Sequence, residues 1–123
     1  MNIARDPRWG RIEEVAGECP TLVAAYARAV ISGMQRGGKN ESSADARYWK
    51  TAAVAKHYVG YSLDCVDPAH PHVGCTEIPD RRWHPWVAGD RHHFNANISK
   101  QDMEESFLPS FAACVQANVS GVM

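Results

Sequence analysis

The sequence predicts an α/β fold in which about three strands alternate with two helices. A short run of small and β-branched residues between Thr51 and His57 is typical of a buried strand. Two longer stretches carry apolar residues at helical spacing, one before and one after that strand. The resulting order of strand, helix, strand, helix and strand favours parallel pairing with right-handed crossovers.

The first predicted strand ends at Ile3 and Ala4, because Pro7 and Gly10 then force a tight, irregular loop. Two arginines flank a tryptophan in this loop. That composition suits recognition of a polar ligand, since guanidinium groups bind oxygens and an indole face stacks on a ring. An Arg–Asp pair with a tryptophan that fixes the loop explains the same residues equally well.

The first helix is predicted from Thr21 to about Gln35. Pro20 fits its first turn, and Gly37-Gly38 ends it. Its apolar positions predict one buried stripe that packs in the core; they are Leu22, Val23, Tyr26, Val30, Ile31 and Met34.

The second helix is predicted to begin at a Ser99 cap, with Asp102 in its first turn, and to run to about Gln116. Its predicted apolar stripe consists of Met103, Phe107, Phe111, Cys114 and Val115. A third strand follows over Val119–Met123.

Lys56 and His57 stand at the C-terminal tip of the central predicted strand. Open α/β sheets and α/β barrels both place their ligand sites at such tips. Neighbours on a regular strand point to opposite faces, so both side chains serve one site only where the strand already bends into its loop. From spacing alone, a solvated strand end with a neutral core histidine is the simpler interpretation.

The segment Cys65–Asp90 has no periodicity of either kind and is predicted to be an atypical insertion, loop-like or disordered. It holds residue types that bind zinc, at a spacing that matches no established ligand pattern: Cys65, His70, His72 and Cys75. A Cys65–Cys75 disulfide is a second interpretation. An unstructured insertion is preferred to both, so no metal site and no cofactor is predicted.

The charge balance excludes some function classes. Thirteen basic residues against fourteen acidic ones leave a net charge of −1, which gives no electrostatic reason to expect nucleic acid or an anionic membrane surface as partner. No apolar run approaches the roughly 20 residues that span a bilayer.

Three asparagines stand in Asn-x-Ser sequons and hint at a secretory route: Asn40, Asn97 and Asn118.

Five separated motifs occur in the order that is seen in glycoside hydrolase family 3. They are Asp6-Pro7-Arg8-Trp9-Gly10-Arg11, Gly17-Glu18-x-Pro20, Lys56-His57-Tyr58, Arg91-His92-His93-Phe94-Asn95-Ala96 and Val122-Met123. The chain resembles the middle of that family's N-terminal (β/α)8-barrel domain over nearly all residues except Cys65–Asp90. The Val59-Gly60-Tyr61 continuation is similar to the β-xylosidase and β-glucosidase branch, because the N-acetylglucosaminidase branch typically continues with Pro-Gly-His-Gly.

The resemblance implies that residues 1–123 are a fragment of a TIM-like barrel from a retaining, exo-acting β-glycosidase that hydrolyses terminal β-linked sugars. It implies substrate-binding roles for Arg11, Lys56 and His57, with Met123 near the same pocket. The family's catalytic carboxylates match no residue of this chain and would lie beyond Met123. The implied partner is an oligosaccharide or glycoside, and the implied location is extracellular or secretory.

Two other interpretations remain open. The chain can be a non-catalytic sugar-binding remnant or the product of a truncated gene, which keeps the sugar ligands without the carboxylates. It can also be a metal-binding or interaction module built on the Cys65–Asp90 insertion.

Overall fold

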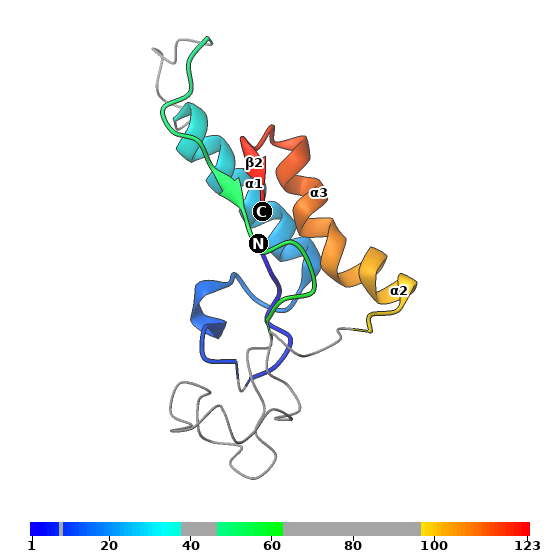
Figure 1. The fold of residues 1–123 in the computed structure, drawn as a ribbon. Helices are drawn as coiled ribbons and strands as arrows, with labels where there is room; N and C mark the ends of the chain where they lie inside the picture. Colours follow the sequence, from blue (N-terminus) through cyan, green and yellow to red (C-terminus); the bar gives the residue numbers. More distant parts are fainter. Residues whose placement is uncertain (8, 38–46, 63–96) are drawn as a thin grey trace, which may run out of the picture.

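The computed structural model describes residues 1–7, 9–37, 47–62 and 97–123 (Figure 1). The predictions for Cys65–Asp90 and for the Arg91–Ala96 motif fall outside these residues, as does Arg8. The elements in chain order are η1 (Ile12–Glu14), α1 (Pro20–Arg36), β1 (Val54–Ala55), α2 (Lys100–Asp102), η3 (Met103–Phe107), α3 (Leu108–Gln116) and β2 (Gly121–Val122).

The ends of α1 confirm the sequence prediction to within about one residue. Pro20 occupies the first turn, where a backbone N–H would have no acceptor within the helix, so the lack of one in proline costs nothing. Gly37 ends the helix at a φ of 87°, a backbone conformation that glycine adopts without steric cost.

The face that α1 buries agrees only in part with the predicted one. Val23 and Ile31 are buried as predicted, whereas Leu22, Tyr26 and Met34 were expected in the core and are about half exposed. The other buried residues of the helix are Ala24, Ala27 and Gln35. The small residues on this face let α1 lie close against α3. Close packing of the two helices, and not the size of the apolar side chains, therefore decides which side of α1 is buried.

The second helical region begins as predicted. The backbone N–H of Asp102 donates to Ser99 Oγ at 3.0 Å, and the Ser99 hydroxyl donates to Asp102 Oδ2 at 2.7 Å. The chain then passes through α2 and the wider π turn η3 into α3. Pro109 is the second residue of α3 and lacks an N–H, so a regular helical bond from it to the carbonyl of Glu105 in the turn is impossible. Val115 is exposed, contrary to the predicted stripe.

The sheet consists of β1 and β2, which run parallel as predicted, with Val54 opposite Gly121 and Ala55 opposite Val122. Both strands are shorter than the predicted ranges of 51–57 and 119–123. Backbone bonding nevertheless continues past them, since Met123 N donates to Ala55 O at 2.9 Å and Tyr58 N donates to Met123 O at 2.8 Å.

The strand that was predicted to end at Ile3 and Ala4 is not formed in the described part of the chain. A side chain replaces the backbone ladder there. Asn2 Nδ2 donates to His57 O and Asn2 Oδ1 accepts from His57 N, both at 2.8 Å. The Met1 amino group donates to Lys56 O. The N-terminal segment therefore lies beside the end of β1 without strand geometry.

The core lies between the sheet and the two long helices. Ala53 and Ala55 belong to the core cluster with residues of α1 and α3, whereas Val54 points to the opposite side of the sheet and is about half exposed. Figure 1 shows the N-terminus, the end of β1 and the C-terminus close together. The core residues are Ala27, Ile31, Ala53, Ala55, Phe111 and Cys114. Within the described ranges, no helix combines the length and apolar character that crossing a bilayer requires.

Candidate functional site

A cavity of about 210 Å³ opens where β1 ends, between the N-terminal loop and the segment after the strand. It brings together three of the four residues that the sequence predicts as ligands: Arg11, Lys56 and His57. The lining also includes Met1, Asn2, Trp9, Glu14, Val15, Val54 and Tyr61.

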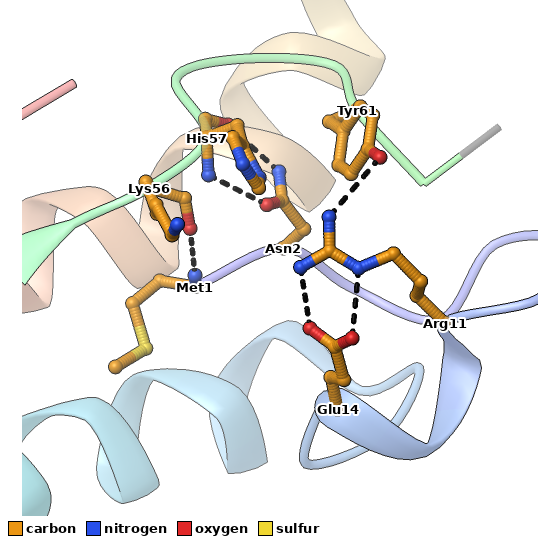
Figure 2. A network of polar contacts seen from close by, with 7 residues as sticks. All are labelled: Met1, Asn2, Arg11, Glu14, Lys56, His57 and Tyr61. Carbon is orange, nitrogen blue, oxygen red and sulfur yellow. Dashed lines mark hydrogen bonds and ion pairs between the residues drawn. The ribbon is translucent and has the colours of Figure 1, made fainter. Parts of the chain in front are cut away.

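Lys56 and His57 both reach this cavity because the chain leaves strand geometry directly after Ala55. Both backbone groups of His57 are held by the Asn2 side chain, as Figure 2 shows. The chain therefore bends directly after β1, and this bend lets the neighbouring side chains of Lys56 and His57 reach the same cavity.

Arg11 precedes η1, and Glu14 is the last residue of that turn. In a 3₁₀ turn, residues three apart lie above one another, so the two side chains meet. Arg11 Nε donates to Glu14 Oε1 at 2.8 Å and Nη2 donates to Oε2 at 2.5 Å. On the other side, Nη1 lies 3.4 Å from the Tyr61 hydroxyl (Figure 2). The guanidinium is thus fixed from two directions.

The Arg11–Glu14 pair changes the proton affinity of both groups. Hydrogen bonding to Arg11, together with its charge, lowers the pKa of Glu14 below its ordinary value of 4.5, and the charges of Lys56 and His57 act in the same direction. The same pairing raises the pKa of Arg11. The cavity therefore keeps an ionised carboxylate and a fixed guanidinium at any pH near neutrality.

We expect the Glu14 carboxyl to titrate below pH 4.5 in the folded chain. Because the folded pKa is depressed, the ion pair contributes fully above the ordinary value and is lost as the pH falls through the lowered one. Carbon-13 NMR of the Glu14 side-chain carboxyl measures this directly. The substitution Arg11→Met should move the midpoint upward; a wild-type midpoint at or above 4.5 would contradict the pairing.

Tyr61 connects the two halves of the site. Its ring makes an edge contact with Trp9 at 5.4 Å between centroids and a tilted contact with His57 at 4.6 Å. The Arg11 guanidinium carbon lies 5.9 Å from the same ring centre. In the sequence, Tyr61 indicates only a family branch, and no signal points to Asn2. The contacts of Tyr61 with Trp9 and Arg11, and of Asn2 with His57, do not follow from spacing, since each joins residues about 50 positions apart.

Met123, the fourth predicted ligand, is not among the residues that line the cavity. Its backbone bonds to Ala55 and Tyr58 at the end of the sheet, and its side chain is 63% exposed. The structure thus brings Met123 to the same edge of the sheet but leaves its side chain outside the cavity. Its role in binding stays a prediction.

The described residues gather no group of three or more side chains that could hold a metal ion. Of the cysteines in these ranges, Cys19 is exposed and Cys114 is buried, and neither forms a disulfide. Among the described residues that line the cavity, Glu14 is the one with an acidic side chain, and both of its oxygens accept from Arg11.

Comparison with known proteins assigns the family. Residues 1–86 match the family model described as the glycosyl hydrolase family 3 N terminal domain. The chain belongs to glycosyl hydrolase family 3. The match spans every residue that lines the cavity, from Met1 to Tyr61. The motif-based resemblance is therefore confirmed for the family and for the region that carries the candidate site.

Similar curated proteins in this family are xylosidases. The chain is 36% identical over 124 residues to beta-D-xylosidase 1 of Arabidopsis thaliana. It is 34% identical to beta-xylosidase/alpha-L-arabinofuranosidase 2 of Medicago sativa subsp. varia, and 35% identical to a probable exo-1,4-beta-xylosidase of Aspergillus clavatus. Each alignment covers the whole chain but 13% of the relative, so the chain spans a small part of the length of these proteins.

Proposed function

We propose that this chain supplies the sugar-binding part of a β-xylosidase-like glycosidase barrel. The observation that carries the proposal is the convergence of Arg11, Lys56 and His57 on one cavity. These side chains donate hydrogen bonds, and each sugar hydroxyl that leaves water needs such a partner. The xylosidase names of the relatives support a β-linked pentoside as the substrate class.

The size of the cavity favours a single sugar ring. Pockets for drug-sized ligands measure about 300–1,000 Å³, and this cavity measures about 210 Å³. One terminal ring held by three donors is the arrangement that an exo-acting glycosidase needs, because the rest of the substrate extends away from the site.

The chemical step is assigned to residues outside this chain. A retaining glycosidase uses two carboxylates roughly 5 Å apart, one as nucleophile and one as acid/base. Glu14 faces the cavity, but both of its oxygens accept hydrogen bonds from Arg11, which makes the carboxylate a weaker base and nucleophile. The chain by itself therefore binds without cleaving, and the natural protein that carries it is proposed to act outside the cell.

Replacement of Lys56 tests the binding role. We expect Lys56→Met to weaken binding of methyl β-D-xylopyranoside roughly 10- to 100-fold, since a hydrogen bond to a charged group contributes about 1.5–3 kcal/mol. Lys100→Met is the matched control, because Lys100 is exposed on α2 and its ion-pair partner is Glu104 at 3.8 Å. Affinities come from calorimetric or NMR titration of the 123-residue chain.

Two outcomes would contradict the proposal. Equal affinity of the Lys56 and Lys100 variants would remove Lys56 from the site. Hydrolysis of 4-nitrophenyl β-D-xylopyranoside by the purified chain would show that the catalytic carboxylates lie within it. A saturable titration without hydrolysis is the result expected for both the fragment and the non-catalytic remnant. The two differ in whether the natural reading frame continues past Met123.

A further inference from the structure

We propose that Glu14 is a positioning residue for the sugar site, and that Glu14 and Tyr61 together form a frame that aims the Arg11 guanidinium into the cavity. The inference rests on the sugar-binding function proposed above and adds to it a role for two residues that the motif comparison did not place. Neither needs to contact the sugar.

The frame is defined by contacts on three nitrogen atoms. Glu14 accepts from Nε and from Nη2, at 2.8 and 2.5 Å, and the Tyr61 hydroxyl lies 3.4 Å from Nη1. An arginine side chain carries five N–H donors. With three of them engaged in this way, two remain, one on each terminal nitrogen, and these are the donors that a ligand in the cavity can use.

Preorganisation is the physical benefit. An exposed arginine samples many rotamers, and fixing it on binding opposes association by about 0.5–1.5 kcal/mol for each such side chain. Here the fork is held before the ligand arrives, because a planar guanidinium and a carboxylate match in two-point geometry. Both side chains are largely exposed, at 37% for Arg11 and 49% for Glu14. The benefit therefore comes from the two-point geometry of the pair and not from exclusion of water.

The frame also sets the charge of the cavity. Glu14 offsets the charge of Arg11, while Lys56 and the Met1 amino group add positive charge beside the cavity. A sugar in the cavity therefore meets a guanidinium whose direction is fixed and whose charge is balanced by its own partner.

Tyr61 acts from the other side and links the frame to the rest of the site. Its ring contacts His57 at 4.6 Å and Trp9 at 5.4 Å, and Trp9 is buried. The ring therefore cannot turn without displacing a predicted ligand. Removing only the hydroxyl, as in Tyr61→Phe, keeps these ring contacts and deletes one of the two sides of the frame.

The test compares Glu14→Gln with Glu13→Gln in the 123-residue chain. Glu13 is the exposed neighbour on the same turn, so the change in charge and size is identical. Two quantities are measured: the solvent exchange of the Arg11 Nε–H proton without ligand, and the affinity for methyl β-D-xylopyranoside. Backbone amide spectra report whether each variant keeps its fold.

We expect Glu14→Gln to accelerate exchange of the Arg11 Nε–H and to weaken binding about tenfold, because charge-assisted pairs are roughly twice as strong as neutral ones. Tyr61→Phe should weaken binding by a smaller factor, and Glu13→Gln should change neither quantity. A purely structural Glu14 would leave the exchange of Arg11 and the affinity of folded protein unchanged.

The failures are distinguishable. A wild-type chain that binds the xyloside, with a folded Glu14→Gln variant that binds equally well, would overturn the positioning role and leave the proposed function intact. A wild-type chain that shows no saturable binding would overturn the proposed function and the role of Glu14 with it. Tighter binding by Glu14→Gln would show that the carboxylate obstructs the site, which also overturns the inference.

Discussion

Replacing Gln35 with methionine should destabilise the folded chain by about 3 kcal/mol, because it leaves one buried and two part-buried backbone groups without their side-chain partner. The Gln35 side chain is fully buried near the end of α1. Its Nε2 donates to Asn118 O at 2.8 Å. Its Oε1 accepts from Ala53 N at 3.3 Å, from Ser120 N at 3.0 Å and from Ser120 Oγ at 2.7 Å.

These bonds tie α1 to the start of both strands of the sheet. Methionine matches glutamine in length and fills the same volume without polar atoms, so the variant isolates the hydrogen bonds from cavity effects. An unpaired buried backbone group costs about 1–3 kcal/mol, and Ala53 N–H, Ser120 N–H and Asn118 C=O all lose their side-chain partner. The register of β1 against β2 should loosen together with the stability.

Gln116→Met is the matched control. Gln116 is exposed at the end of α3, where its Oε1 accepts from Arg28 at 3.2 Å, and a surface change of this kind is expected within about 0.5 kcal/mol. Urea denaturation followed by circular dichroism measures both variants. A Gln35→Met midpoint equal to that of the control would contradict the assigned role of the buried amide.

Replacing Phe111 with alanine is the second change with a large expected effect. The side chain is 3% exposed and belongs to the core cluster between α1, α3 and β1. Deletion of a buried aromatic ring costs about 3–5 kcal/mol through lost burial and the cavity that remains. The Phe111 ring also meets Tyr58 edge to face at 5.1 Å, so the loss reaches the loop that carries Lys56 and His57.

Tyr48→Ala is the control, because Tyr48 is 72% exposed and its removal should change stability by less than about 0.5 kcal/mol. Hydrogen exchange at the Tyr58 amide, which donates to Met123 O, reports the loop separately from global unfolding. We expect Phe111→Ala to lower both the denaturation midpoint and the protection of this amide. Unchanged protection in a destabilised variant would show that the loop is held independently of Phe111.

The sequence predicted the helices well because their signals are local. Pro20 and Gly37 fix α1, and the Ser99 cap starts the second helical region; each acts within one turn of the residue concerned. The parallel pairing of β1 with β2 followed from the order of elements, which needs no side-chain detail.

The wrong predictions concern choices that depend on distant parts of the chain. A helix with apolar residues on two faces does not reveal which face meets α3, so Leu22 and Tyr26 were placed inside although they are exposed. A glutamine near a helix end is ordinarily solvated. Gln35 is buried because its side-chain amide bonds to backbone groups at the starts of β1 and β2, which lie far away in the sequence.

The candidate site was foreseen in part for the same reason. Arg11, Lys56 and His57 could be named from motifs, and the structure brings them to one cavity. The contacts that position them mostly join residues about 50 positions apart and have no signature in spacing. They are the Asn2–His57 pair and the contacts of Tyr61 with Trp9 and Arg11. The contact of Tyr61 with His57 spans only the loop after β1.

The most direct test of the central claim, that Arg11, Lys56 and His57 bind one sugar ring, is an NMR titration of the chain with methyl β-D-xylopyranoside. The side-chain and backbone resonances of all three residues should shift together and saturate with a single dissociation constant, while those of Trp49 at the opposite end of the sheet stay unchanged. Absence of saturable shifts, or shifts that leave any two of the three residues unaffected, would contradict the account.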